Sequence, residues 1–321
     1  KWQRFIRTDL GRSRKDAKVR RVTAIVFEGG EPRSDVEEMV VLVRKAIALD
    51  NLEKLQGLSG IERVILFTNY HDLAREASRL GVFIEFARVG ERFHFGSKLL
   101  DIVRRHRCES VLYLGGAIGS LLTRGDFAKI VRLLSRDEPV LVTNNLFSSD
   151  IIGFSPAEAL ELNSLPSQDN SLAMALQAEK GLPVTVVEDG AGWAFDVDTP
   201  SDVMVLAACP PSSERIRSGL GTLALDLARL EAARGVFKIP YSDVLLFGRV
   251  NPSTVAFLNR ETQCRIRAFS EERGMRALGR LERSEVVSLM GLFLERIGPG
   301  EFFRLISKTC HAGFIDTRVL F

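Results

Sequence analysis

The sequence predicts an α/β fold, a three-layer sandwich in which helices cover both faces of a mostly parallel sheet, followed by a C-terminal all-α domain. Three observations lead to this prediction. Short β-branched runs alternate with segments of helical period from residue 22 to about 208, a Pro-Pro-Ser-Ser stretch at 210–213 ends the alternation, and only helical period follows. Strands separated by single helices need crossover connections, which are right-handed and give parallel sheets.

The elements of the α/β part follow in order. Buried runs predict strands at 22–28, 61–69, 82–89 and 109–119, and a strand or hairpin at 139–156. A strand at 182–189 and a last strand around 194–198 complete the sheet. Helical spacing of apolar residues predicts helices at 34–58, 71–81, 96–107, 123–137, 170–181 and 200–208. We therefore expect an α/β domain at 22–210.

Residues 211–310 show helical period only, and the apolar segment at 311–321 is expected to dock as a strand or an ordered tail. We expect helices at 220–235, 252–262, 270–298 and 300–310, and we interpret residues 211–321 as a small helical domain. Its apolar faces, in "LGTLALDLARL" and "VVSLMGLFLERI", are expected to pack against the α/β domain, because apolar surface is costly to leave in water.

Composition excludes several classes of protein. The chain has 321 residues, 45% of them hydrophobic, which is enough for a sizeable core. No run approaches 18 apolar residues and the N-terminus lacks a signal-like apolar segment, so we expect no membrane insertion or export. The four cysteines lie far apart without C-x-x-C spacing, which indicates reduced thiols, a cytoplasmic protein and no zinc site.

The N-terminal arm, residues 1–21, carries nine Lys/Arg and two Asp, for a net charge of +7 within a chain of +3. The remaining residues are therefore mildly acidic, at −4. A solvated arm is the simplest interpretation, and a contact with nucleic acid or another polyanion is the alternative. We favour the first, so nucleic acid is the least expected partner.

Glycines and acids follow several of the predicted strands. Gly29-Gly30, Gly115-Gly116 and Asp196/Asp198 come after apolar runs, and Gly96 opens a predicted helix. Open parallel sheets bind ligands at the carboxyl ends of their strands. We therefore expect these residues to meet in one crevice.

The order of these elements resembles the nucleotidyltransferases of the glycosyltransferase-A type, in particular the 2-phospholactate guanylyltransferases and the molybdenum-cofactor guanylyl- and cytidylyltransferases. The strongest match is "DNSLAMALQAEKGLPVTVVEDGAGWAFDVDTPSDV", with "GSKLLDIVRRHRCESVLYLGG", "VTNNLF" and "AIVFEGGEPR" as further similar stretches. The resemblance covers residues 22 to about 207. It implies a nucleoside triphosphate, Mg²⁺ and an anionic small-molecule acceptor.

The sequence departs from that family in two places. Its phosphate loop normally holds cations, whereas Glu28, Glu31 and three acids at 35–38 crowd the loop here, with Arg33 as the nearby cation. The family's central strand ends in a magnesium-binding aspartate, and this chain has Gly115-Gly116 there. Losing one of two magnesium carboxylates removes much of the charge compensation at such a site.

Asp196 and Asp198 allow two interpretations that are compatible. Alternate residues of an extended chain face the same side, so both aspartates could hold a divalent ion, as the resemblance implies. Alternatively, Thr199 or Ser201 caps the following helix, with Pro200 in its first turn and Asp202 complementing the dipole. The helix cap does not require the side chains of Asp196 or Asp198, so both roles fit together.

The resemblance assigns the remaining candidate residues. Asp196 and Asp198 are the candidate catalytic and Mg²⁺-binding residues. The candidate nucleotide-binding residues are Gly29, Gly30, Arg33, Gly96, Lys98, Gly115, Gly116 and Asn144.

Two functions follow from these residues. The first is a nucleotidyltransferase-like protein that transfers a nucleoside monophosphate from a nucleoside triphosphate to a phosphorylated or anionic small acceptor, releasing pyrophosphate. The second is a catalytically degenerate homologue that binds a nucleotide or metabolite, or acts in an assembly; a homo-oligomer is compatible with either.

Overall fold

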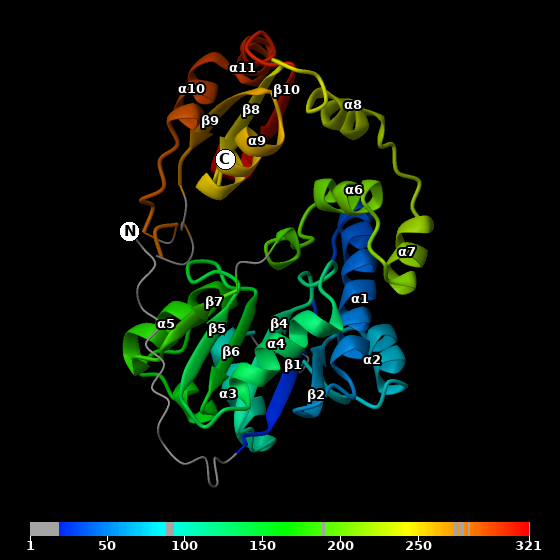
Figure 1. The fold of residues 1–321 in the computed structure, drawn as a ribbon, viewed down its shortest axis with the longest axis vertical. Helices are drawn as coiled ribbons and strands as arrows, with labels where there is room; N and C mark the ends of the chain where they lie inside the picture. Colours follow the sequence, from blue (N-terminus) through cyan, green and yellow to red (C-terminus); the bar gives the residue numbers. More distant parts are fainter. Residues whose placement is uncertain are drawn as a thin grey trace.

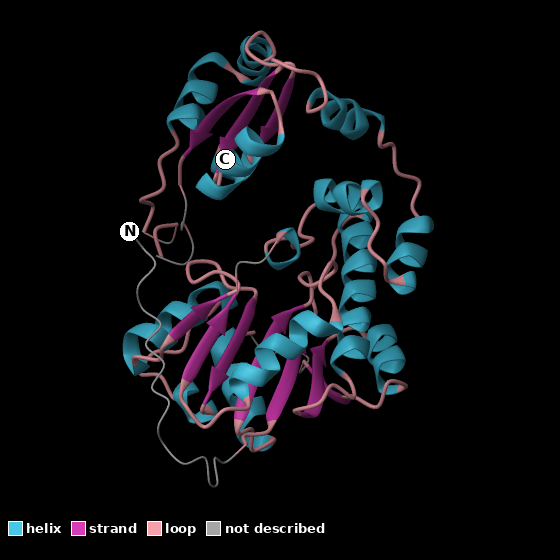
Figure 2. Ribbon diagram, in the orientation of Figure 1, coloured by secondary structure: helices cyan, strands magenta, loops and turns pink. Residues whose placement is uncertain are grey.

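The computed structural model describes residues 19–87, 93–187, 190–272, 275, 279–281 and 283–320. The basic N-terminal arm lies outside the described residues except for its last three positions. Two sheets organise the chain, a large one in the N-terminal part and a small one in the C-terminal part (Figures 1 and 2). We call the two parts the larger unit and the smaller unit.

The larger unit contains a seven-stranded sheet of order β3-β2-β1-β4-β6-β5-β7. All neighbouring pairs are parallel except those of β6, which runs antiparallel to both β4 and β5. The expected mostly parallel sheet and the hairpin after residue 139 are therefore confirmed. Its strands are β1 (Val22–Phe27), β2 (Ile61–Thr68), β3 (Phe83–Phe86), β4 (Ser110–Gly115), β5 (Val140–Thr143), β6 (Ile151–Ser155) and β7 (Val184–Val186).

Helices cover both faces of this sheet. Its helices are α1 (Asp35–Leu55), α2 (His71–Ser78), α3 (Phe95–Arg105), α4 (Arg124–Leu134), α5 (Leu172–Lys180) and α6 (Pro200–Ala208), with short 3₁₀ turns η1 (Ala157–Leu160), η2 (Asp169–Ser171) and η3 (Ala191–Trp193). Apolar side chains of α1, α2 and α4 form one core, and those of α3 and α5 form the other.

Strand β1 shows why the sequence produces this sandwich. All six of its residues are buried, with Val22, Ala24 and Val26 in one core and Ile25 and Phe27 in the other. Successive side chains of a strand point to opposite faces, so a continuous apolar run suits a strand covered on both sides. Consequently β1 lies inside the sheet, between β2 and β4.

The chain after residue 198 begins a helix as the sequence predicts. The Thr199 side chain accepts the backbone N–H of Asp202, and the Asp202 carboxylate accepts the Thr199 N–H at 2.8 Å, which is a capping box at the start of α6. The strand expected just before it is wrong, because residues 196–198 make only one isolated bridge, between Ile118 and Asp196.

Two helices connect the units. Helix α7 (Glu214–Gly221) contributes Ile216 and Leu220 to a core with α1 and α6, so part of the expected apolar packing is present. Helix α8 (Ala228–Val236) follows, and its Arg234 donates from Nη1 to the carbonyl of Ala208 at 3.2 Å.

The smaller unit is α/β, so the prediction of an all-α domain is wrong. Three parallel strands lie in the order β10-β8-β9. The elements are β8 (Asp243–Gly248), α9 (Pro252–Glu261), β9 (Arg265–Ser270), α10 (Leu289–Ile297), α11 (Pro299–Ile306), β10 (Ala312–Ile315) and η4 (Thr317–Val319). The "VVSLMGLFLERI" face was expected to pack against the larger unit, but it packs within the smaller unit, against Phe247 of β8 and Phe302 of α11.

Among the described residues, none of the helices combines the length and the apolar character that a membrane crossing needs.

Candidate active site at the carboxyl edge of the large sheet

The loop after β4 brings Asp196 and Asp198 to the carboxyl edge of the sheet. Val197 donates its backbone N–H to the carbonyl of Ala117 at 3.1 Å, and Asp196 forms the bridge with Ile118. The Val197 side chain is fully buried in the core of α1, α6 and α7. Because side chains alternate along an extended chain, the two aspartates lie on the opposite side from that core.

Gly29-Gly30 and Gly115-Gly116 lie at the same edge. Strand β1 pairs with β4 in parallel up to Phe27 and Gly115, so the chain leaves both strands side by side. The sequence-predicted glycine pairs and aspartates therefore share one end of the sheet, where an open parallel sheet binds its ligands.

Glu28 occupies the space beside Gly116. A Cβ added to Gly116 would lie 1.9 Å from Glu28 Oε2 and 2.7 Å from its Cβ, so no larger residue fits there while Glu28 keeps this position. The Glu28 side chain has no exposed surface, and Arg44 of α1 donates to its Oε2 from Nη2 at 3.1 Å. The sequence placed Glu28 among the acids of the phosphate loop, whereas it points inward, beneath the end of β4.

Burial raises the pKa of the Glu28 carboxyl, although Arg44 lowers it, and the charge of Asp198 raises it further. Its Oε1 atom is buried and has no hydrogen-bond partner among the described residues. Burial lowers the pKa of Arg44, but the charges of Glu28 and Asp198 raise it overall. Arg44 therefore lies near both acids and neutralises part of their charge.

Two further aspartates, Asp150 and Asp169, reach this edge, and the sequence reasoning missed both. Asp150 precedes β6 and accepts the backbone N–H of Gly115 with its carbonyl at 2.9 Å. The Asp169 Oδ2 accepts the hydroxyl of buried Tyr113 at 2.9 Å and would lie 3.7 Å from a Cβ on Gly115. Neighbouring segments thus surround the end of β4 with carboxylates that β4 itself lacks.

The carboxyls at this edge repel one another. Burial and the charges of Asp196 and Asp169 raise the pKa of Asp150 to about 8. Burial and the charge of Asp198 raise the pKa of Asp196 to about 7. Burial also raises the pKa of Asp169. We name Asp150, Asp169, Asp196 and Asp198 the acidic cluster. Burial and neighbouring charges disfavour the ionised forms of Asp150 and Asp196, and a bound cation or proton offsets this cost.

The loop after β1 uses much of its hydrogen-bonding capacity internally. The Asn69 amide accepts from Gly30 N–H at 3.0 Å and donates to the Gly30 carbonyl at 2.8 Å. Asn69 Oδ1 would also lie 2.7 Å from a Cβ on Gly29, so glycine permits this close approach. The Arg33 side chain is exposed next to the N-cap of α1, whose first turn carries Asp35, Glu37 and Glu38.

Gly96, Lys98 and Asn144 have internal contacts. The Gly96 N–H donates to the Pro166 carbonyl at 2.9 Å, so segment 165–167 covers the N-terminus of α3. The Lys98 ammonium lies 5.6 Å from the centre of the Phe67 ring. The Asn144 Oδ1 accepts from Asp150 and Ile151 N–H, and its Nδ2 donates to the Trp193 carbonyl at 2.9 Å. Asn144 therefore holds Asp150 and η3 in place.

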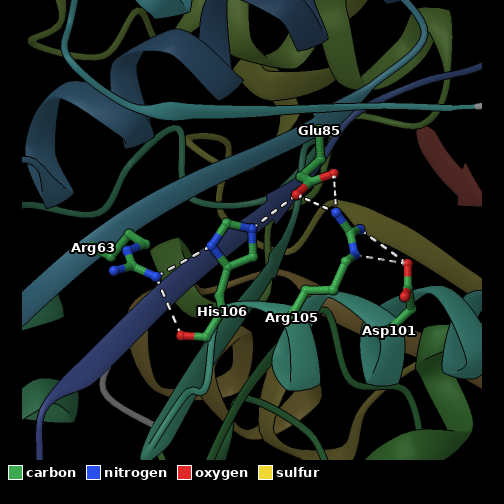
Figure 3. A network of polar contacts seen from close by, with 5 residues as sticks. All are labelled: Arg63, Glu85, Asp101, Arg105 and His106. Atoms are coloured by element: carbon green, nitrogen blue, oxygen red, sulfur yellow. Dashed lines mark hydrogen bonds and ion pairs between the residues drawn. The ribbon is translucent and has the colours of Figure 1, made fainter.

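A histidine–carboxylate pair lies elsewhere, between the edge strand β3 and the end of α3 (Figure 3). His106 Nε2 lies 2.8 Å from Glu85 Oε1, Arg63 Nη1 lies 3.2 Å from His106 Nδ1, and Arg105 bridges Glu85 and Asp101. Burial opposes ionisation of Glu85, but hydrogen bonds from His106 and Arg105 lower its pKa. This network joins α3 to the sheet edge and contains no Ser or Cys nucleophile.

Neither a family model nor a curated protein matches the sequence. Solved structures similar to this chain include a nucleotidyl transferase from Methanothermobacter thermautotroptrophicus, at 14% identity over 62% of this chain and 99% of that one, with a TM-score of 0.45. Another is 4-diphosphocytidyl-2C-methyl-D-erythritol synthase from Anaerococcus prevotii, at 13% identity over 59% and 96%, with a TM-score of 0.44.

A third similar structure is CMP:2-keto-3-deoxy-manno-octonic acid synthetase, complexed with CTP, at 13% identity over 59% of this chain and 98% of that one, with a TM-score of 0.40. This is a likeness of fold.

The acidic cluster fits a divalent cation that arrives together with phosphate. Among the described residues, no three His, Cys, Asp or Glu side chains are arranged to hold a metal by themselves. Mg²⁺ commonly binds proteins through one or two carboxylates and completes its octahedron with water and substrate phosphates. The side chains of Asp196 and Asp198 take no part in capping α6, so they are two carboxylates of the kind that Mg²⁺ takes as ligands.

Proposed function

We propose that the protein transfers a nucleoside monophosphate from a nucleoside triphosphate to a phosphorylated or anionic small molecule, with release of pyrophosphate. The observation that carries this proposal is the acidic cluster. Carboxylates from three separate segments meet beside the glycine loop at the carboxyl edge of the mostly parallel sheet. Their mutual repulsion raises the pKa of Asp150 and Asp196. Such a concentration of acids suits a cation-dependent phosphate site.

Asp196 and Asp198 are the residues that would hold Mg²⁺, which, when bound, neutralises phosphate charge. Gly29, Gly30 and Arg33 form the loop for the phosphates, with Arg44 as a second cation on the same side. Gly115 leaves space beside Asp169, Gly116 accommodates the Glu28 side chain, and Asn144 keeps Asp150 in place. Gly96 and Lys98 open the helix that flanks the site.

The test measures the melting temperature of the full chain with each nucleoside triphosphate, with and without Mg²⁺. A ligand at a hundredfold excess over its Kd stabilises the folded state by about 2.7 kcal/mol. We expect one triphosphate to raise the melting temperature only with Mg²⁺, and Asp196→Asn or Asp198→Asn to abolish the rise. Asp101→Asn, an exposed acid of the Figure 3 network, is the matched control.

A triphosphate-dependent rise that needs no Mg²⁺ and survives both substitutions would remove the metal role from these aspartates. Pyrophosphate release in the presence of a pool of phosphorylated small acids then measures transfer itself.

The second candidate is a degenerate homologue that binds a nucleotide without chemistry. The loop after β1 favours it, because Asn69 occupies both backbone groups of Gly30 and the first turn of α1 carries three acids that repel phosphate. A triphosphate-dependent stabilisation without pyrophosphate release for any acceptor would support this candidate.

A further inference from the structure

The carboxyl edge of the small sheet carries a compact group of charges. Asp316 follows β10, and its carboxylate accepts Arg249 Nε at 2.8 Å and Arg318 Nε at 2.9 Å. Arg249 follows β8, the neighbouring strand. Arg249 and Arg318 thus flank one carboxylate, and the three side chains together carry one net positive charge.

Gly248 makes this approach of the two strand ends feasible. Its φ is +110°, and a Cβ there would lie 2.6 Å from the Asp316 Cβ. Only glycine adopts that backbone conformation readily and leaves that space. The local sequence is therefore adapted to bring Asp316 against the end of β8.

The backbone of Arg318 is fixed on both sides. Asp316 caps the short turn η4 by accepting the Arg318 N–H, and Val319 and Leu320 are buried in the core with Phe247. The Arg318 side chain itself is 55% exposed. A rigid turn thus presents a guanidinium that is held at Nε by Asp316, and among the described residues its other N–H groups make no hydrogen bond.

This edge faces the larger unit. Figure 1 shows the strands of the small sheet running toward the larger unit, with the chain's C-terminus at that end. Burial lowers the pKa of Arg318, while Asp316 and then Asp196 and Asp198 raise it, so Arg318 lies within electrostatic reach of the acidic cluster. Arg318 at the small sheet and the Asp196–Asp198 pair at the large sheet are therefore oppositely charged groups that interact electrostatically.

We propose that Arg318, positioned by Asp316 and Arg249, binds a phosphate group between the smaller unit and the Asp196–Asp198 pair. Guanidinium binds phosphate in a bidentate, charge-assisted manner. A phosphate held on the acidic side through a cation leaves oxygens directed away from it, which a second cation can take. The phosphate belongs to the nucleotide or to the acceptor, so this inference rests on the proposed function for its substrate.

The experiment compares Arg318→Met with Arg260→Met in the full chain. Arg260 is an exposed, ion-paired arginine on α9 and has no place at the strand ends, which makes it the matched control. Two probes are titrated by calorimetry: inorganic phosphate, and each triphosphate with Mg²⁺. We expect Arg318→Met to raise the Kd of at least one probe tenfold or more, Arg318→Lys to recover part of the loss, and Arg260→Met to change neither.

The two probes show whether the phosphate that Arg318 binds belongs to the nucleotide or to the acceptor. Loss of triphosphate binding assigns Arg318 to the nucleotide, and loss of inorganic phosphate binding alone assigns it to the acceptor. Unchanged Kd values for both probes in Arg318→Met would overturn the inference while leaving the proposed function intact. A wild-type protein that binds neither probe would overturn both. An unchanged melting temperature of the ligand-free variant shows that it is folded.

Discussion

The two carboxyl edges of this molecule differ in charge although the same kind of parallel sheet forms both. At the large sheet, burial and neighbouring acids raise the pKa of Asp150 to about 8 and that of Asp196 to about 7. At the small sheet, burial opposes ionisation of Asp316, but hydrogen bonds from Arg318 and Arg249 lower its pKa. The same residue type is therefore destabilised in its charged form at one edge and stabilised at the other.

This difference shows which properties come from topology and which from neighbours. Parallel strands gather loop residues at one end of a sheet whatever their chemistry. The effect of each carboxylate then depends on whether acids or arginines arrive beside it. The acidic edge needs a cation from outside, whereas the basic edge already has an excess of one positive charge around Asp316.

The largest expected effect concerns pH and Asp150. Its folded pKa lies about 4 units above the ordinary value of 3.8, so the folded protein keeps a proton that the unfolded chain loses. The free energy of unfolding should therefore fall as pH rises from about 4 to about 8, by at most roughly 5 kcal/mol from this group. Asp150→Asn should be more stable than wild type at pH 8.5 in urea unfolding, with little difference at pH 4.5.

Asp137→Asn, an exposed acid paired with Arg20, is the control and should leave the pH dependence as in wild type. If the difference between wild type and Asp150→Asn is the same at both pH values, the acidic edge is not strained by its charges. Bound Mg²⁺ would offset the repulsion between the carboxylates of the acidic cluster. Added Mg²⁺ should therefore reduce the difference in free energy of unfolding between wild type and Asp150→Asn at pH 8.5.

The next effect concerns Gly116. Gly116→Ala should lower the free energy of unfolding by about 3 kcal/mol, because the added Cβ meets the Cβ as well as the carboxylate of Glu28. Gly115→Ala, where the nearest atom would lie 3.7 Å away, should cost less than about 1 kcal/mol. Equal costs in denaturant unfolding would show that Glu28 moves aside easily and does not shape this edge.

The smallest effect concerns Asp316. Asp316→Asn removes charge-assisted hydrogen bonds to Arg249 and Arg318 and should cost about 1 to 2 kcal/mol at neutral pH. Since the folded pKa is lowered, the stabilisation is present above the ordinary pKa and is lost as pH falls through the folded value, opposite to Asp150. The measurement is urea unfolding at pH 7 and pH 3.

Glu301→Gln, which breaks an exposed pair with Arg304, should cost at most about 0.5 kcal/mol at pH 7. A cost for Asp316→Asn that is no greater than this control, or that is unchanged at pH 3, would contradict the role of Asp316 as an anchor for two arginines.

Sequence patterns predicted the larger unit well because its strands are long apolar runs between clear helix signals. In the smaller unit they predicted the helices at 252–262 and 300–310 but missed the strands β8 and β9. Strand β8 is one short apolar run, which periodicity alone does not separate from a buried helix segment. Strand β9 is mostly exposed and contains Arg265 and Arg267, so it lacks an apolar run altogether. Strand β10 lies in the apolar C-terminal segment that was expected to dock as a strand or an ordered tail.

The candidate site likewise contains residues that the sequence singled out and residues that it missed. Asp196 and Asp198 could be singled out because they stand beside a recognisable helix cap, and the Thr199–Asp202 capping box is a local signal. Asp150 and Asp169 had no such signal. Their importance comes from lying beside Gly115, and contacts between residues far apart in the chain leave no periodic trace in either segment.

The sequence by itself determined the order of strands and helices in the larger unit, the start of α6 and the glycine pairs at the strand ends, because these depend on neighbours a few residues away. Only the tertiary structure decided that Glu28 lies against Gly116 at the end of β4, that Asn144 holds Asp150, and that Arg318 lies within electrostatic reach of Asp196 and Asp198. Side-chain direction and charge depend on which segments the sheet brings together, and backbone pairing joins segments that lie far apart along the chain, as at the bridge between Ile118 and Asp196.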